Sequence, residues 1–183
     1  VFSGLFASQS ALDRTQARVD GGEPEDIRAS MVSAEYFSTL GVPALLGRAF
    51  RTDDDPSAPY AVISYDYWQR RFGGRADILG TTIAIRRGVF SIMGVAPASF
   101  FGETVGQRPD VWLPLTLQPA VLPGRDWLHE TPGDLEKVMW LHVFGRLKEG
   151  VTIEQAQAAA NVTFQQGLAA HYGSALLPAD QKA

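Results

Sequence analysis

Cysteine is absent from the 183-residue sequence. Its absence excludes zinc–thiolate sites, iron–sulfur clusters, thiol catalysis and disulfide bonds together. A chain without thiols suits an oxidising compartment, but it is also common in the cytosol, so this feature alone does not fix the compartment.

Long apolar runs are missing as well. No uninterrupted stretch approaches the ~20 residues that cross a bilayer, and no signal peptide is visible. The first residue is Val1 rather than Met. We therefore expect the chain to be a segment of a longer protein, with any membrane helix or export signal outside it.

The sequence also has no excess of positive charge. Sixteen Lys and Arg residues face 20 Asp and Glu residues, and the only basic clusters are the doublets Arg70-Arg71 and Arg86-Arg87. Proteins that bind nucleic acids usually present a basic face, because neutralising phosphates dominates their affinity. We interpret the doublets as solvated side chains and expect no nucleic-acid partner.

The composition is that of a globular domain. Hydrophobic residues make up 45% of the chain, and its length permits a sizeable core without disulfides or a structural metal. Glycine and proline, at 18 and 11 residues, stay below the ~25% that is typical of low-complexity chains. One domain, or two small lobes in one chain, is expected.

Apolar patterning predicts several strands and few helices. Residues 1–24 read as a short helix or loop that ends in a turn at Gly21-Gly22. Strands are predicted at 26–33, 60–63, 81–86, 89–95 and 138–147, with an edge strand or strand end at 110–113. The strand over 138–147 has apolar residues on both faces, which predicts a central position in a sheet. Arg87-Gly88 is the predicted hairpin turn, and 118–134 is a long irregular segment.

Capping residues delimit three predicted helices. Ser33 and Gly41 bracket a short helix over 34–40, and a second helix runs from the N-cap Ser64 to Gly73-Gly74. The third helix starts at a capping box and carries one apolar stripe up to Gly173. Its defining residues are Thr152 and Gln155 in the box, and Ile153, Ala156, Ala160, Phe164, Leu168 and Tyr172 in the stripe.

These elements predict an α+β fold whose two ends pair while the middle forms a second lobe. The loop of Asp53, Asp54, Asp55 and Pro56 is the expected boundary between lobes. The last strand and helix invite a βαβ-like partner, for which the strand at 26–33 is the candidate.

Residues able to carry out chemistry are scattered. The three histidines match no compact metal spacing, and the aspartates of 53–55 lack the alternate spacing and closing glutamate of a calcium loop. We interpret His142 as a core or surface imidazole, His171 as a partner of its helix C-terminus, and 53–55 as a solvated turn. Trp68, Trp112, Trp127 and Trp140 either line a ligand cleft or, as we favour, pack in the core and at contacts.

Nucleophile elbows and phosphate-binding glycine loops are also absent from the sequence. We therefore assign no catalytic, cofactor-binding or metal-binding residue, expect neither a cofactor nor an enzyme, and leave any ligand-binding residues unassigned. A free-standing hydrolase is the least favoured function.

Most of the chain resembles the periplasmic core domain of MacB-type permeases, which are FtsX-like. The resemblance spans roughly 27–170 and includes the large duplicated permeases of acidobacteria. The matching strings are VSAEYFSTLGV (32–42), GRAF (47–50), AVIS (61–64), RFGG (71–74), LGTTI (79–83), FSIMGVAP (90–97), PDVWLP (109–114) and GRLKEGVT (145–152).

The resemblance implies an extracytoplasmic domain of an ABC transporter permease, on the periplasmic side of the bacterial inner membrane. A porter-like βαβ lobe would comprise 1–56 and 136–183, and a β-rich inserted lobe 57–135. The implied partners are the transmembrane helices of the parent permease, a separate cytoplasmic ABC ATPase, and a periplasmic adaptor or substrate protein. The domain would be non-catalytic and would couple ATP hydrolysis to export or release by mechanotransmission. A periplasmic ligand-binding or sensor domain is the alternative, based on the aromatic content and a cleft between lobes.

Overall fold

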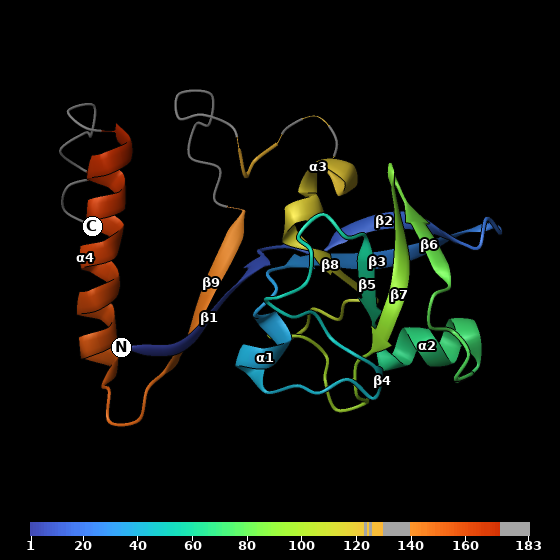
Figure 1. Ribbon diagram of the computed structural model, residues 1–183, viewed down its shortest axis with the longest axis horizontal. Helices are drawn as coiled ribbons and strands as arrows, with labels where there is room; N and C mark the ends of the chain where they lie inside the picture. The colour runs from blue at the N-terminus through green and yellow to red at the C-terminus, as the bar shows by residue number, and fades with distance from the viewer. Residues whose placement is uncertain (123, 125, 130–139, 173–183) are drawn as a thin grey trace.

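Six strands pair in a closed ring that forms the body of the molecule. The computed structural model describes residues 1–122, 124, 126–129 and 140–172. Residues 171 and 172 are described by their backbone alone. The pairings run from β2 through β6, β7, β5, β8 and β3, and then back from β3 to β2 (Figure 1). These strands are β2 (Asp13–Val19), β3 (Pro24–Val32), β5 (Tyr60–Ile63), β6 (Thr82–Ile85), β7 (Gly88–Val95) and β8 (Val111–Pro114). Two neighbouring pairs, β5–β7 and β3–β8, are parallel and the others antiparallel.

The inside of this barrel is the larger of two hydrophobic cores. Alternate residues of a strand point to opposite faces, so Ala61 and Ile63 of β5 face inward while Val62 faces outward. Every strand of the ring contributes inward apolar side chains, which include Ala17, Ile27, Ile83, Phe90, Ile92, Val111 and Leu113. Closing the ring thus buries one face of all six strands without a second sheet.

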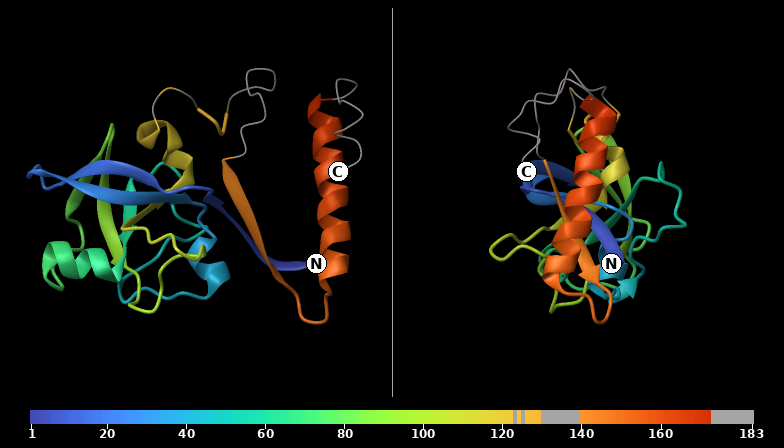
Figure 2. Two further views of the ribbon diagram at one scale, coloured as in Figure 1. Left: turned by 180° about the vertical axis from the view of Figure 1, so that it is seen from behind. Right: turned by 90° about the vertical axis from the view of Figure 1, so that its left-hand side faces the viewer.

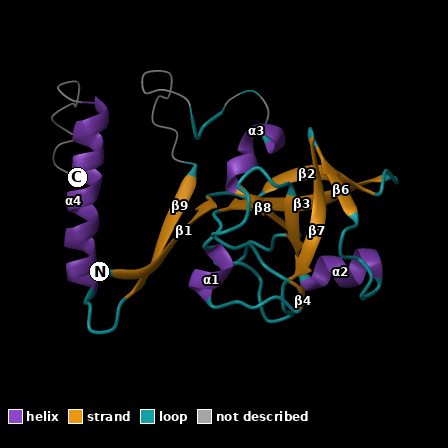
Figure 3. Cartoon of the chain, in the orientation of Figure 1, coloured by secondary structure: helices purple, strands orange, loops and turns teal. Residues whose placement is uncertain are grey.

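Short helices lie against the ends of the barrel. Figure 3 shows α2 (Tyr65–Phe72) below the ring and α3 (Gln118–Val121), preceded by the 3-10 turn η1 (Leu115–Leu117), above it. Tyr67 of α2 and Val121 of α3 are fully buried and belong to the inner core. The two helices therefore close the barrel core at opposite ends.

A second core covers part of the outside of the barrel. Trp112 and Val62 point outward from β8 and β5 and pack with Tyr36 and Phe37 of α1 (Tyr36–Leu40). The rings of Phe37 and Trp112 meet edge to face, with centroids 5.6 Å apart. Because Trp112 lies between two inward-facing residues, one short strand supports both cores.

The two ends of the chain form a ribbon that projects from the barrel. β1 (Phe2–Gln9) and β9 (Leu141–Leu147) pair antiparallel, and α4 (Ile153–Tyr172) stands beyond them (Figure 2). Between residues 153 and 170 only Ala156 is buried, and Ile153 is 74% exposed. The chain is thus α+β, as predicted, and its ends pair.

Local capping signals from the sequence are largely confirmed. The Ser64 hydroxyl accepts the Tyr67 N–H, and Gly73 ends α2 in a left-handed conformation. Thr152 and Gln155 exchange the two hydrogen bonds of a capping box. Gly41 ends α1 as predicted, but α1 begins only at Tyr36, because the Ser33 hydroxyl accepts the Ala7 N–H of β1 instead of capping the helix.

Several predicted positions are wrong. Residues 1–24 form strands β1 and β2 rather than a helix or loop, although their turn falls at Asp20-Gly21, next to the predicted glycines. The predicted central strand, β9, lies at the end of the strand order, and Val143 is 71% exposed. Its neighbour is β1, not the strand at 26–33, because that strand already pairs with β2 along 24–29 and with β8 along 29–32.

Smaller differences concern the middle of the chain. The β6–β7 turn is Arg86-Arg87, one residue before the predicted pair, with Arg86 in the left-handed region and Gly88 paired with Ile85. β8 is no edge strand, since β5 and β3 flank it; Pro114 marks a strand end. The short α3 interrupts the segment expected to be irregular, most of whose second half lies outside the described residues.

One two-residue strand fastens a loop to the barrel. β4 (Leu46–Gly47) pairs with the end of β7, where Gly47 lies opposite Gly94. A Cβ at Gly94 would lie 2.2 Å from the Arg48 carbonyl oxygen, so the two backbones approach closely only because Gly94 has no side chain.

None of the described helices is both long and apolar enough to span a bilayer.

Candidate functional site

The ribbon meets the barrel at a carboxylate. The Ser8 hydroxyl of β1 donates a hydrogen bond of 2.6 Å to Glu103 Oε1, and the Tyr36 hydroxyl of α1 donates one of 2.5 Å to Oε2. Ser8 and Tyr36 are fully buried. Glu103 lies on the loop between β7 and β8, so one side chain joins the ribbon, the short helix and a barrel loop.

Backbone contacts at the same place are few. β1 pairs directly with β3 only where Ser8 lies opposite Val32. The Ser33 N–H donates to the Ala7 carbonyl at 2.9 Å, and the Ser33 hydroxyl accepts the Ala7 N–H at 3.1 Å. Because the shared ladder is so short, the bonds to Glu103 contribute much of the connection between ribbon and barrel.

Aromatic rings surround this carboxylate. Phe6 of β1 stacks on Phe144 of β9 at 4.9 Å and meets the edge of Tyr36 at 5.1 Å. Burial, followed by the hydrogen bond to Glu103, raises the pKa of Tyr36 far above its ordinary value, so the phenol stays a proton donor. We name the set Phe6, Ser8, Tyr36, Glu103 and Phe144 the ribbon joint.

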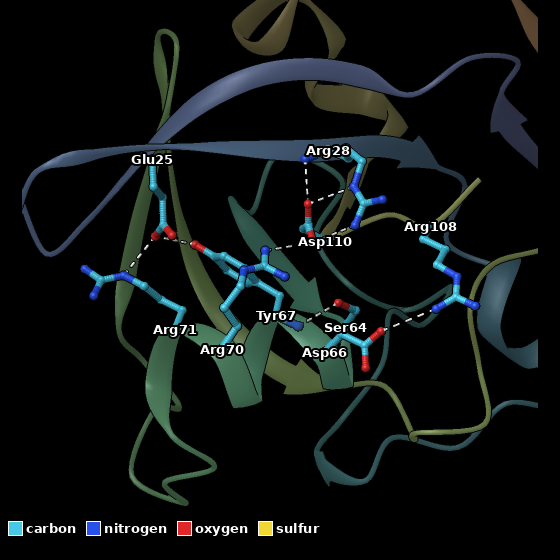
Figure 4. A network of polar contacts seen from close by, with 9 residues as sticks. All are labelled: Glu25, Arg28, Ser64, Asp66, Tyr67, Arg70, Arg71, Arg108 and Asp110. Atoms are coloured by element: carbon cyan, nitrogen blue, oxygen red, sulfur yellow. Dashed lines mark hydrogen bonds and ion pairs between the residues drawn. The ribbon is translucent and has the colours of Figure 1, made fainter. Parts of the chain in front are cut away.

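A second polar network holds α2 to the barrel (Figure 4). The carboxylate of Asp110, 2% exposed, accepts the backbone N–H of Arg28 and three guanidinium hydrogen bonds, two from Arg28 and one from Arg70, at 2.9–3.2 Å. Burial alone would raise the pKa of Asp110, but the hydrogen bonds from Arg28 and Arg70 outweigh it and lower the pKa. The charged form is therefore the one that the fold stabilises.

A second carboxylate, on β3, is held by α2 in a similar way. Glu25 of β3 accepts the Tyr67 hydroxyl at 2.8 Å and pairs with Arg71 at 2.8 Å. Burial, followed by the bond to Glu25, raises the pKa of Tyr67. The basic doublet Arg70-Arg71 was expected to be merely solvated, but it pairs with two carboxylates of the barrel, because α2 packs against β3 and the start of β8.

Two histidines have described side chains, and one of them, His142, lies opposite Ser8 of the ribbon joint. His129 pairs with Asp126 at 2.9 Å on an exposed segment, and His142 is exposed on β9, with its ring 6.0 Å from that of Phe144. The side chain of His171 lies outside the described residues. The described residues bring together no group of three or more potential metal ligands.

The four tryptophans do not gather. Trp112 is buried, Trp68 donates its indole N–H to the Arg75 carbonyl at 2.7 Å, and Trp127 and Trp140 meet at 5.1 Å. This outcome agrees with packing rather than with the lining of one cleft. Asp53 is exposed, as expected of a solvated turn, while Asp54 is fixed by Arg48 at 2.7 Å.

Sequence reasoning missed the ribbon joint and the Asp110 network. Glu103 is 95 residues from Ser8, and Asp110 is 82 residues from Arg28. No local pattern marks such pairs. The one available signal was a buried polar position, since Ser8 and Ser30 alternate with apolar residues along their strands.

The fold is similar to those of periplasmic and extracellular permease domains. The periplasmic region of MacB from Actinobacillus actinomycetemcomitans matches with a TM-score of 0.62 at 14% identity, over 90% of this chain and 66% of that one. The extracellular domain of the noncanonic ABC-type transporter YknZ from Gram-positive bacteria matches with a TM-score of 0.60 at 17% identity, over 91% and 76%. The chain thus spans about two thirds of the length of the MacB structure. No curated protein sequence matches significantly.

At these identities the structures show the fold alone, and the family follows from the sequence. The family model of the MacB-like periplasmic core domain matches residues 5–162, which include the ring of strands, the ribbon joint and half of α4. This range covers nearly the whole of the resemblance noted from the motifs. The chain therefore belongs to the family of MacB-like periplasmic core domains.

Proposed function

We propose that this domain is a non-catalytic coupling element on the periplasmic side of the bacterial inner membrane. It passes movement driven by ATP hydrolysis in a separate cytoplasmic ABC ATPase, through the transmembrane helices of its permease, to the exterior. There it drives export or release and contacts an adaptor or substrate protein. The proposal includes a porter-like lobe of 1–56 and 136–183 and an inserted lobe of 57–135.

The observation that carries the proposal is that the first and last strands of the described chain form one ribbon. β1 and β9 pair from Phe2 opposite Leu147 to Gln9 opposite Leu141, and the Lys148 N–H donates to the Val1 carbonyl at 3.0 Å. β1 and β9 lie side by side, and the N-terminus lies near the start of α4 (Figure 1). The register shifts once, between Phe2 and Gly4, and the ladder is regular from Gly4 to Gln9. A hydrogen-bonded ladder of this kind transmits a displacement applied at its outer end to its inner end.

At its inner end the ribbon is held by the joint. A displacement of β1 reaches Ser8, then Glu103, then α1 and the barrel loop, through hydrogen bonds shorter than 2.7 Å. Charge-assisted hydrogen bonds to a carboxylate are among the strongest in proteins, so this path is stiff. Glu103 is a positioning residue in this proposal.

The test uses the complete permease assembled with its ATPase. Hydrogen exchange of residues 1–183 is compared between the nucleotide-free complex and the complex trapped with ATP and vanadate. We expect trapping to change exchange in β1, β9 and the loop that carries Glu103. In Glu103→Ala the change stays within the ribbon, while the rate of ATP hydrolysis remains within about twofold of the wild type.

Glu149→Ala is the matched control, because Glu149 is exposed in the turn before α4. It should behave as the wild type in both measurements. If trapping changes no peptide of the wild-type domain, the coupling role is wrong. If Glu103→Ala transmits the change to the barrel undiminished, the role of the joint is wrong while the coupling role stands.

A further inference from the structure

A cleft of about 350 Å³ opens beside the barrel, where the ends of β3 and β8 meet the loop over 50–58. Its walls come from four segments that are distant in the sequence: 32–35, 50–60, 114–116 and Leu128. The acidic loop proposed as a lobe boundary forms one wall. The family comparison and the coupling role leave this cleft unused.

The interior of the cleft is apolar. Val32 and Phe50 form its buried floor, and Tyr60, Leu115 and Leu128 are half-buried on its sides. Removing apolar ligand surface from water against such side chains stabilises a complex by roughly 25 cal/mol per Å². The floor therefore favours an apolar ligand group.

The rim of the cleft is negative. Glu35, Asp54 and Asp55 line it, and Arg51 is the one cationic residue among the described lining residues. Asp54 is neutralised by Arg48, and Arg51 lies 3.8 Å from Asp53. Within the described part of the chain Glu35 has no ion-pair partner, and the Asp55 carboxylate accepts hydrogen bonds only from the N–H and hydroxyl of Ser57. Two carboxylates thus stand available above an apolar floor.

We propose that this cleft binds a small cationic amphiphile, with its apolar part on Phe50, Tyr60 and Leu115 and its positive group beside Glu35 and Asp55. Charge complementarity selects the cation, because an anion would face two carboxylates that lack a basic partner. A volume of about 350 Å³ lies at the lower end of the 300–1,000 Å³ typical of small-molecule sites. A recess of that size admits a small molecule more readily than the side of a folded partner.

Three probes with one tail and different heads test the proposal: octyltrimethylammonium, octanoate and octyl glucoside, all below their micelle concentrations. Binding is followed by nuclear magnetic resonance of the labelled domain. We expect octyltrimethylammonium to shift signals of 32–35, 50–60 and 114–116, with a Kd about tenfold below that of octyl glucoside. Octanoate binds more weakly still, and the affinity for the cation falls as salt is added.

Variants of the lining residues test separately the role of the rim carboxylates and the role of the space within the cleft. Glu35→Gln with Asp55→Asn should bring the affinity for the cation down to that for octyl glucoside, because the apolar floor remains. Thr52→Trp adds bulk to an exposed lining residue and should weaken all three probes. Glu23→Gln changes an exposed carboxylate on the β2–β3 turn, outside the cleft, and should leave every Kd unchanged.

The proposal is overturned if no probe shifts these signals, if the three heads bind equally, or if the shifts map elsewhere. A lysine- and leucine-containing peptide, tested in parallel, decides the remaining alternative. If that peptide binds the cleft and octyltrimethylammonium does not, the site docks a peptide rather than a small amphiphile. None of these results depends on coupling to the ATPase.

Discussion

Asp110→Asn should unfold the domain at a markedly lower temperature. The substitution keeps the shape of the side chain but removes its charge and turns an NH₂ group toward guanidinium donors. The wild-type carboxylate, 2% exposed, accepts four hydrogen bonds from Arg28 and Arg70. The variant therefore loses charge-assisted bonds and opposes donor to donor.

The magnitude follows from the burial of the partners. Removing one member of a buried ion pair typically costs about 3–5 kcal/mol of unfolding free energy. The side chains of Arg28 and Arg70 are 39% and 53% exposed, so water partly replaces the lost acceptor and the lower figure applies. About 3 kcal/mol in a domain of this size corresponds to a fall in melting temperature of about 6–12 °C.

Thermal unfolding followed by circular dichroism measures the effect. Asp77→Asn is the matched control, because Asp77 pairs with Arg75 at 2.8 Å but is 71% exposed. Such exposed pairs contribute little, so this variant should melt with the wild type. Equal melting temperatures for the two variants would refute the reasoning that burial makes the Asp110 network stabilising.

Two further predictions concern the acid stability of the domain and substitutions of two glycines. The hydrogen bonds that lower the pKa of Asp110 stabilise the fold above the ordinary carboxyl pKa of about 3.9 and are lost as the pH falls toward the folded value. Melting temperature should therefore drop below about pH 4, and less steeply in Asp110→Asn. Gly94→Ala should greatly lower the yield of folded protein, because the added Cβ would lie 2.2 Å from the Arg48 carbonyl oxygen. Gly167→Ala should raise the melting temperature slightly, because the position lies in a helix with open space around it. Expression and melting of the two alanine variants side by side check this contrast.

Elements with their own start and stop signals could be predicted from the sequence. Ser64 and Gly73 bound α2 because a hydroxyl and a left-handed glycine satisfy helix ends locally. β2 carried no comparable signal: only Ala17 and Val19 are buried along it, and its pairing with β3 and β6 makes it a strand. Tertiary pairing overrides a weak local pattern in such cases.

For β9 the strand itself was predicted, but its burial was overestimated. Its apolar residues on both faces, such as Val143 and Phe144, predicted a strand covered on each side, yet the described residues cover it only in part. The site was harder still to predict. Glu103 and Asp110 act through partners that lie 40 to 95 residues away, so their roles follow from the closed topology and not from spacing.

Ring closure also determines which strands have open edges that another chain could pair with. Strands within the ring have hydrogen-bonded neighbours on both sides. Among the residues that the structure describes, β9 pairs only with β1, which meets β3 at a single residue pair. Open strand edges are the places at which foreign chains add and proteins aggregate. Intermolecular β-pairing, whether with a partner protein or with a misfolded copy, should therefore start at the ribbon. The strands of the closed barrel should not take part in such pairing.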